Sequence, residues 1–432
     1  MRALGTIAVV LAISLCVTTP ASADPRGDRI ERVSVGGSDG NWDYATSQSP
    51  AISANGRFVA FASRAYDLVP GDDNGREQDI FVRDMRTGRT TMVSRTPAGS
   101  AGNGESRFPS VSADGRYVAF DSEASNLVPG DTNDTFDVFV RDVWRERTIR
   151  VDVGLGGTEA DQGAGLPDIS ADGRHVAFDS ASTNLVPGDT NGQRDIFVRD
   201  LVAGLTDRVS LTADGSQSGS YSQYSSISAD GNRVAFQSSI GLVPGPPDPK
   251  LSDAIYVHDR RRTTTVKVSA GVGRPEFFIN EIGEPVISDD GQVVAFTFVG
   301  SMTVGQDWVC SVWVHDLRTG RLALVTPDAR PEDTTRGNWE PSLSADGRFV
   351  SFTSAHRLRP QDRNQIWDVY LRDRRTGGLR LLTGAQTSPS GSGAQTSAVS
   401  ADARRVAFYA DSTGLAPGGT PGFPHIYRWS DR

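Results

Sequence analysis

Cysteine and histidine are scarce in this chain of 432 residues, which contains two cysteines and five histidines. Cys16 lies in an apolar N-terminal stretch, residues 4–17, and an Ala-Ser-Ala tripeptide follows at 21–23. That combination is typical of a signal peptide with a small-x-small cleavage site. We therefore expect residues 1–23 to be a signal peptide, cleaved near Ala23. Cys310 then has no intramolecular partner, which excludes a disulfide-stapled fold.

Long apolar runs and a basic charge balance are also lacking. No segment after the N-terminus approaches the roughly 20 apolar residues of a membrane-spanning helix, so we expect no transmembrane anchor. The mature protein is expected to be secreted, or to lie in the periplasm or cell envelope. The 53 acidic residues exceed the 44 Lys and Arg, which disfavours nucleic acid as a partner. With little helical periodicity and with 46 Gly and 23 Pro, the chain favours the all-β class.

One eleven-residue motif recurs seven times. Its copies read AISANGRFVAF, SVSADGRYVAF, DISADGRHVAF, SISADGNRVAF, VISDDGQVVAF, SLSADGRFVSF and AVSADARRVAF. The repeat units begin near residues 49, 108, 166, 224, 284, 340 and 396, and successive copies of the shared serine are 56 to 60 residues apart. A fixed period of this length is the sequence signature of a repeat architecture.

Each copy predicts a β-hairpin. An Asp-Gly pair, as at Asp114-Gly115, separates two short apolar runs, and this pattern favours a two-residue type I′ turn. Asp402-Ala403 replaces the pair in the last copy, so we expect a looser hairpin there. A third run such as DIFVRD from Asp79 follows, and a short turn leads to a fourth run, for example 91–94. Four antiparallel strands in about 58 residues make one propeller blade.

The two ends of the chain predict how the ring closes. The last copy reaches its third strand at 425–429 and has no fourth, whereas residues 29–35 resemble a fourth strand and precede the first copy. We therefore expect an all-β, seven-bladed β-propeller of four-stranded antiparallel blades over residues 24–432, closed 3+1 by the N-terminal strand. An open stacked array is the alternative, but it would leave an incomplete blade with an exposed edge.

The motif S-A-D-G-R-x-V-A-F followed by D-I-F-V-R-D resembles the WD40-like (PD40) repeat of TolB-type propellers. The resemblance covers nearly the whole predicted mature chain. It departs from TolB itself, because no α/β domain precedes the repeats and seven copies are present. It therefore implies an exported stand-alone propeller rather than a component of the Tol–Pal system.

The loops between the second and third strands of a blade, the b–c loops, are the best candidates for a metal site. Four of them carry an Asp–Asn–Asp triplet, and three of the four share the spacing D-x-N-x-x-x-D. Such oxygen ligands suit Ca²⁺, although no glutamate closes the loop as in an EF-hand. Turn formation by Asp and Asn is the alternative interpretation. The candidate ligands are Asp72, Asn74, Asp79, Asp131, Asn133, Asp137, Asp189, Asn191, Asp195, Asp362, Asn364 and Asp368.

Catalytic motifs are weak by comparison. The GGSDG segment at 36–40 matches G-x-S-x-G, but no strand–turn–helix context surrounds it. The histidines stand where other copies carry different residues, and Cys310 has no evident partner. The Arg-Asp pairs that end the third strands are expected to brace turns. Exposed aromatic residues are expected in the loops between blades, the d–a loops, where binding specificity often resides; the candidates are Trp42, Tyr44, Tyr221, Tyr224, Phe277, Phe278 and Trp339.

The sequence therefore favours a monomeric, non-catalytic propeller that binds a protein or a glycan, and stabilisation by calcium is expected only if the b–c loops are metal sites and not turns alone. The alternative is an extracytoplasmic hydrolase or lyase that uses loop carboxylates at the propeller channel. An enzyme should bring two or three titratable groups together at one mouth of the channel, whereas a binder should present an aromatic or charged patch.

Overall fold

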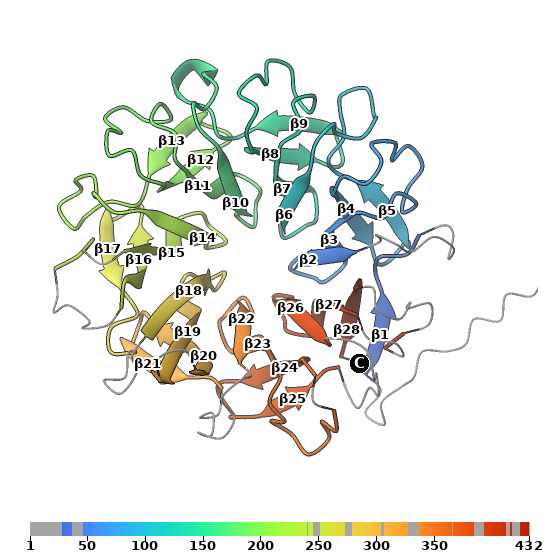
Figure 1. The fold of residues 1–432 in the computed structure, drawn as a ribbon, viewed down its shortest axis with the longest axis vertical. Helices are drawn as coiled ribbons and strands as arrows, with labels where there is room; N and C mark the ends of the chain where they lie inside the picture. The colour runs from blue at the N-terminus through green and yellow to red at the C-terminus, as the bar shows by residue number, and fades with distance from the viewer. Residues whose placement is uncertain are drawn as a thin grey trace, which may run out of the picture.

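The computed structural model describes residues 28–36, 46–239, 241–244, 251–272, 279–303, 306–326, 337–364, 366–383, 393–411, 415–416 and 424–431. Seven four-stranded antiparallel sheets are arranged as blades around a central axis (Figure 1). This arrangement confirms the predicted seven-bladed propeller. The predicted signal peptide at 1–23 lies outside the described residues, as does most of the 36–40 segment.

Each blade runs outward from its first strand, strand a, to its fourth, strand d. Blade 1 comprises β2 (Ser47–Ile52), β3 (Phe58–Ser63), β4 (Asp79–Asp84) and β5 (Arg89–Met92). Blade 2 comprises β6 (Ser106–Val111), β7 (Tyr117–Ser122), β8 (Asp137–Asp142) and β9 (Arg147–Arg150), and a 3-10 turn, η1 (Leu155–Gly157), follows it. Blade 3 comprises β10 (Ala164–Ile169), β11 (His175–Ser180), β12 (Asp195–Asp200) and β13 (Leu205–Arg208).

The second half of the ring repeats this order. Blade 4 comprises β14 (Ser222–Ile227), β15 (Arg233–Ser239), β16 (Asp253–Asp259) and β17 (Thr264–Lys267). Blade 5 comprises β18 (Ile279–Ile287), β19 (Val293–Thr303), β20 (Gln306–Asp316) and β21 (Arg321–Leu324). Blade 6 comprises β22 (Asn338–Leu343), β23 (Phe349–Ser354), β24 (Asp368–Asp373) and β25 (Leu379–Leu381), and blade 7 contains β26 (Ala394–Val399), β27 (Arg405–Ala410) and β28 (His425–Ser430).

The N-terminal strand completes blade 7. Strand β1 (Arg29–Arg32) pairs antiparallel with β28, with Arg29 opposite Ser430. Beyond β1, the backbone N–H of Val33 donates to the carbonyl oxygen of Ile426 at 2.7 Å. The structure is therefore consistent with the expected 3+1 closure, although the regular strand ends at Arg32 and not at residue 35.

The a–b hairpins differ from the predicted two-residue type I′ turn. The Ser53 N–H donates to the Phe58 carbonyl at 2.9 Å, and Gly56 N–H donates back to Ser53 at 2.8 Å, so the loop is longer than two residues. Of the Asn55-Gly56 pair, only the glycine has a positive φ, of 66°. The type I′ prediction was wrong because the Ser53 hydroxyl caps the turn, accepting the Phe58 N–H at 2.9 Å.

The last hairpin keeps the same structure without glycine. Ala403 adopts a φ of 55°, and its N–H donates to the Ser400 carbonyl at 2.9 Å, as the glycines do in other blades. Asp402 Oδ1 accepts the Ser400 hydroxyl at 2.8 Å. The looser hairpin that we expected at this position is therefore not observed.

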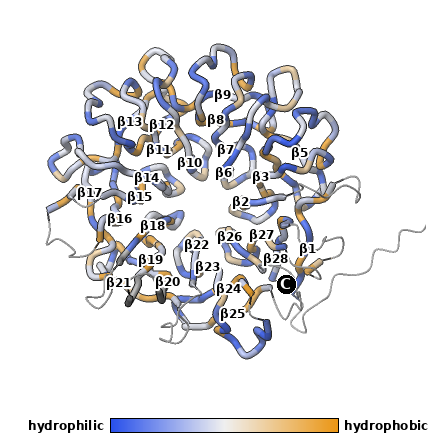
Figure 2. The backbone as a smooth tube through the Cα atoms, in the orientation of Figure 1, coloured by the Kyte–Doolittle hydropathy of each residue, from blue (hydrophilic) through white to orange (hydrophobic). Residues whose placement is uncertain are grey.

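The hydrophobic core lies between neighbouring blades. In one cluster, Ile80 and Val82 of blade 1 pack with Val118, Phe120 and Phe139 of blade 2. In blades 1 to 4, 6 and 7 a stacked aromatic pair joins strands b and c, as Phe120 and Phe139 do at a centroid distance of 5.8 Å. Figure 2 shows hydrophobic stretches within the strands and hydrophilic ones in many of the loops. Strands b and c are therefore buried on both faces.

Backbone hydrogen bonds link the a–b hairpins into a ring. The alanine of the SADG motif donates its N–H to the equivalent carbonyl of the next blade, as Ala54 does to Ala113 at 3.2 Å. The series continues through Ala171, Ala229, Asp289, Ala345 and Ala401, with Asp290 as the donor at one step, and returns to Ala54. Small residues at this position allow the hairpins to approach one another around the axis.

Candidate functional site

The axial channel is lined by strand a of all seven blades and has a cavity volume of about 540 Å³. The alanine ring of the a–b hairpins lines one end. Toward the other end, each strand a carries a β-bulge where the register against strand b shifts. Bulges reorient a side chain and are frequent near functional sites. The channel is therefore the place where one bulge from each blade can present a side chain to the same cavity.

One bulge residue in each blade has a positive φ and lines the channel. The φ angles lie between 41° and 55°, a region that residues other than glycine seldom adopt. Two of these bulge residues are hydrogen-bonded through their backbone to an aspartate on strand b of the preceding blade. Asp121 Oδ2 accepts the Leu166 N–H at 3.3 Å, and Asp179 Oδ2 accepts the Tyr224 N–H at 3.4 Å. The ring of bulge residues is Ser49, Phe108, Leu166, Tyr224, Glu284, Glu340 and Thr396.

This ring has an apolar side and an acidic side. Blades 2, 3 and 4 contribute Phe108, Leu166 and Tyr224, and the two aromatic residues are 42% and 38% exposed. Blades 5 and 6, which are adjacent in the ring, contribute Glu284 and Glu340. A ligand at this mouth of the channel meets apolar and aromatic surface on one side and two carboxylates on the other.

The two glutamates lie close enough for each to affect the electrostatic environment of the other. The Glu284 side chain is exposed to the channel, and its partial desolvation by the surrounding channel wall, together with the Glu340 carboxylate, raises its pKa to about 7. Glu340 Oε2 is buried without a hydrogen-bond partner. Further along the channel lie Asp168 and Asp289, whose pKa values are also raised, chiefly by burial. Among the described residues that line the channel there is no Lys, Arg or His.

Asp168 also has a structural role. Its Oδ1 accepts the Ser110 hydroxyl of the preceding blade at 2.7 Å, and its Oδ2 accepts the Ile227 N–H of the following blade at 2.8 Å. Because both oxygens are engaged, this carboxylate joins three blades rather than presenting a free oxygen. The other carboxylates that line the channel are Glu284 and Glu340 in the bulge ring and Asp289 at the hairpin end.

The b–c loops place the predicted Asp–Asn–Asp triplets at the entry to strand c. In blade 2, Asn133 Nδ2 donates to Asp137 Oδ1 at 2.9 Å and to the Ala160 carbonyl at 3.2 Å. Asn74 and Asn191 make the same contacts with Asp79 and Asp195. The asparagine thus turns its nitrogen, not its oxygen, toward the carboxylate. These contacts favour the turn interpretation for the asparagines and leave the aspartates as candidate cation ligands.

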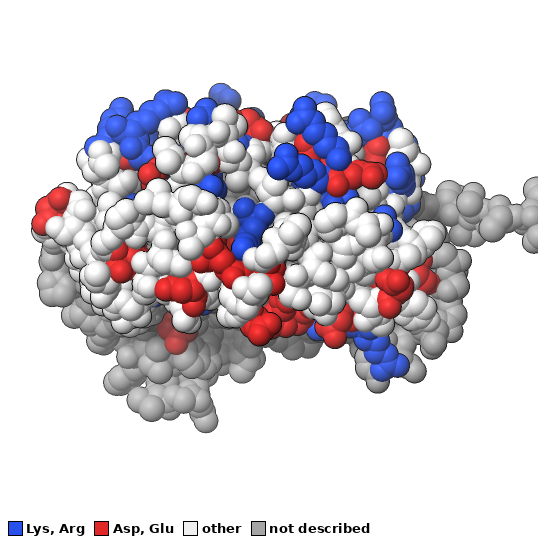
Figure 3. All heavy atoms as spheres, turned by 90° about the horizontal axis from the view of Figure 1, so that it is seen from above, with Lys and Arg blue, Asp and Glu red and all other residues white. Residues whose placement is uncertain are grey.

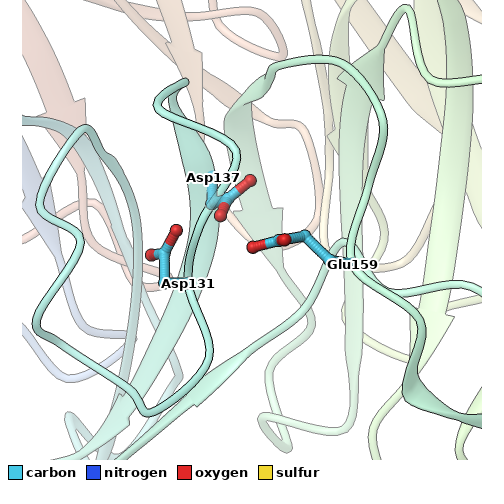
Figure 4. A group of neighbouring side chains, drawn as sticks. All are labelled: Asp131, Asp137 and Glu159. Carbon is cyan, nitrogen blue, oxygen red and sulfur yellow. The ribbon is translucent and has the colours of Figure 1, made fainter.

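Blade 2 contains a group of three carboxylates. Oxygen atoms of Asp131, Asp137 and Glu159 lie within 4.8 Å of one another, and the three side chains converge between the b–c loop and the following loop (Figure 4). The guanidinium of Arg150 lies among them, with Nη1 3.5, 3.1 and 2.5 Å from the three residues in that order. An internal cation therefore already occupies this cluster and offsets part of its negative charge.

The same position differs between blades. In blade 3, Arg208 Nη1 is 3.0 Å from Asp189 and 3.4 Å from Asp195. The strand registers place Met92 of blade 1 and Leu381 of blade 6 where Arg150 and Arg208 stand. The pairs Asp72–Asp79 and Asp362–Asp368 therefore lack the arginine. Burial and the neighbouring carboxylate raise the pKa of Asp72 to about 7, and that of Asp368 also to about 7.

The remaining sequence candidates serve the scaffold. Burial raises the pKa of the Cys310 thiol to about 12, and burial lowers the pKa of His258, whose Nδ1 lies 3.0 Å from the Thr265 hydroxyl. Asp142 of an Arg-Asp pair accepts from Arg116 of the hairpin at 2.6 Å and caps the c–d turn at Trp144. These aspartates therefore brace turns, as expected.

The aromatic candidates are partly placed by the structure. Tyr221 and Tyr224 are exposed, but Tyr224 belongs to β14 and not to a loop. Trp42, Tyr44, Phe277 and Phe278 lie outside the described residues. Sequence reasoning missed Phe108, Glu284 and Glu340, which precede proline in F-P, E-P and E-P pairs at equivalent places in the repeat. An alignment of the residue before that proline would have found the ring.

Comparisons with known proteins show likeness in fold. No protein-family model and no curated protein matches the chain. An oligogalacturonate lyase from Vibrio parahaemolyticus has 12% identity and a TM-score of 0.56, covering 96% of both chains. An oligogalacturonate lyase in complex with manganese has 12% identity and a TM-score of 0.55, over 96% of this chain and 97% of that one. A TolB from Agrobacterium tumefaciens has 19% identity and a TM-score of 0.42, over 81% and 96%. At these identities the lyases share the propeller fold alone.

Proposed function

We propose that this protein is an exported, non-catalytic binding propeller whose channel mouth receives a cationic group of a protein partner. The observation that carries the proposal is the acidic side of the bulge ring, Glu284 and Glu340, which lies across the channel from the exposed ring of Phe108 and next to that of Tyr224. Export is inferred from the N-terminal sequence. In the described part of the chain, no helix is long and apolar enough to span a membrane.

The chemistry of the mouth favours a basic peptide segment. Charges interact more strongly in a channel walled by protein than at an open surface, and a peptide with an arginine or lysine beside an apolar residue could contact both the carboxylates and the apolar side chains of the ring. Aromatic faces also attract cations. A neutral glycan offers no charge to the glutamates, and a polyanion such as an oligogalacturonate would be repelled by them. A protein partner is therefore favoured over a glycan.

Matched peptides test this proposal. Short labelled peptides with phenylalanine next to either arginine or citrulline differ only in charge, and fluorescence anisotropy would compare their affinities for the full chain. We expect the arginine peptide to bind at least tenfold more tightly, and Glu340→Gln to remove most of that difference. Glu123→Gln, an exposed carboxylate outside the channel, should bind like the wild type. Equal affinities for both peptides, or binding of neutral glycans instead, would contradict the proposal.

A second function is favoured by one specific observation. Glu284, whose pKa is raised to about 7, lies beside Glu340, and a carboxyl group with a raised pKa next to a second carboxyl group is typical of acid–base catalysis on glycans. We therefore also propose a hydrolase or lyase that acts on a neutral or cationic polysaccharide. Reducing-end assays on a panel of such glycans would test it. Turnover that Glu284→Gln abolishes would establish the enzyme, whereas turnover that persists in this variant would exclude the glutamate as its catalyst.

A further inference from the structure

The b–c loop of blade 6 has two buried carboxylate oxygens with no partner. Asp362 and Asp368 are 3% and 2% exposed, and Asp362 Oδ1 and Asp368 Oδ2 have no hydrogen-bond partner. Their other oxygens are engaged, because the Tyr370 hydroxyl donates to Asp362 Oδ2 at 2.7 Å and the Thr383 hydroxyl donates to Asp368 Oδ1. Asn364 also acts on both residues, through its backbone N–H on Asp362 and its side chain on Asp368, yet Asp362 Oδ1 and Asp368 Oδ2 remain without a hydrogen-bond partner.

Comparison with blades 2 and 3 shows what these oxygens lack. There, Arg150 and Arg208 reach from the end of strand d and place a guanidinium nitrogen between the two aspartates of the loop. Leu381 takes the equivalent place in blade 6, paired with Tyr370 as Arg150 is with Phe139. The repeat has therefore kept both acids in blade 6 and lost the cation that neutralises them.

Blade 1 lacks the arginine as well but differs in its surroundings. Asp79 has both oxygens engaged, by Ser94 and Asn74, and the nearby Arg95 acts electrostatically on Asp72. In blade 6 the charged group that acts on Asp362 is Arg357, an exposed residue whose guanidinium donates to the Pro360 carbonyl. Of the four b–c loops that carry the acid pair, the loop of blade 6 is therefore the one in which both aspartates have a buried oxygen without a hydrogen-bond partner.

We propose that the b–c loop of blade 6 binds one Ca²⁺ ion through Asp362 and Asp368, in the place that an arginine fills in blades 2 and 3. Hard divalent cations prefer carboxylate, carbonyl and water oxygens, and both aspartates supply such oxygens. The proposed site lies in a b–c loop and does not depend on a ligand in the channel. At the affinities of extracellular modules, we expect a Kd of about 10⁻⁴–10⁻³ M.

Terbium luminescence offers a direct test on the full chain. Tb³⁺ replaces Ca²⁺ at oxygen sites, and Tyr370, whose hydroxyl contacts Asp362, would sensitise its emission. We expect tyrosine-excited emission that Ca²⁺ displaces and that Asp362→Asn abolishes. The matched variant Asp131→Asn in blade 2 should keep the emission, because Arg150 holds that position.

A second variant tests the same site without removing a carboxylate, in case Asp362→Asn impairs folding. Leu381→Arg supplies blade 6 with the arginine of blades 2 and 3, and it should abolish the emission while circular dichroism remains that of the wild type. Absence of tyrosine-sensitised emission in the wild type would overturn the proposal. So would emission that survives both Asp362→Asn and Leu381→Arg, or emission that depends on Asp131.

Discussion

The backbone N–H of Ala401 donates a hydrogen bond of 3.0 Å to the carbonyl oxygen of Ala54 and so joins the last blade to the first. This bond belongs to the ring around the hairpin end of the channel, whereas the pairing of β1 with β28 closes the sheet of blade 7. The ring is therefore closed twice, near its axis by hairpins and farther out by the N-terminal strand. Residues at each closure should contribute to the stability of the whole propeller.

The contribution of the N-terminal strand is testable at Val33. This side chain is fully buried in a cluster with Val59, Phe61 and Ile426. We expect Val33→Ala to lower the free energy of unfolding by roughly 2 kcal/mol, because it removes apolar contacts and leaves a cavity. Val202→Ala, at a residue that is 77% exposed, should leave stability unchanged. Urea unfolding of both variants measures the difference, and equal stabilities would show that the N-terminal segment does not seal the ring.

The hairpin glycines make a second prediction. Gly115 and Gly130 have nearly equal positive φ angles of 77° and 76°. A methyl group on Gly115 would overlap the Phe58 ring of the preceding blade, whereas one on Gly130 meets nothing within 4 Å. We expect Gly130→Ala to cost about 1 kcal/mol from backbone strain, and Gly115→Ala about 2–3 kcal/mol more from overpacking. If thermal melts gave the same loss for both, close hairpin packing would not contribute to stability.

Much of this fold was predictable because the repeat encodes it. The short apolar runs on either side of the turn residues in each copy indicated strands and hairpins, and the strand-like segment at 29–35 indicated closure. The channel site was not predictable to the same degree, because Glu284 and Glu340 come together only when blades 5 and 6 pack side by side with their bulges at the channel. The role of Arg150 was also hidden, since only the register of strand d places it between Asp131 and Asp137.

The pH dependence of peptide binding should report on Glu284. Its pKa of about 7 means that the carboxyl is largely neutral at pH 6 and largely ionised at pH 8. A cationic peptide should therefore bind up to about tenfold more weakly at pH 6 than at pH 8, if it requires the ionised form. Glu284→Gln should bind weakly at both values. A wild-type affinity that is constant over this range would exclude the titration of Glu284 from binding.

The same glutamate should reduce stability at alkaline pH. Because its pKa in the folded state is raised above the ordinary value of 4.5, the folded state holds more protons than the unfolded state between about pH 4.5 and 7. Stability then falls as pH rises through that window. We expect Glu284→Gln to melt at a higher temperature than the wild type at pH 8 and at nearly the same temperature at pH 4.5. A variant that is less stable at pH 8 would show that the carboxylate is stabilising there.

Removing the arginine from blade 2 should create there the kind of cation site that we propose for blade 6. Arg150→Met introduces the residue that blade 1 carries at this position and leaves Asp131, Asp137 and Glu159 around the place of the lost guanidinium. Removing one partner of a buried ion pair typically costs about 3–5 kcal/mol, so the variant should melt well below the wild type in EGTA. If the loop requires a positive charge at this position and not arginine itself, Ca²⁺ at about 10 mM should restore part of the lost stability. For a Kd of about 10⁻⁴–10⁻³ M, the gain should be roughly 1.4–2.7 kcal/mol. The further substitution Glu159→Gln should diminish that recovery. A loss of stability that Ca²⁺ does not reduce would mean that the loop requires the shape and hydrogen bonds of arginine. A bound cation could then not replace Arg150.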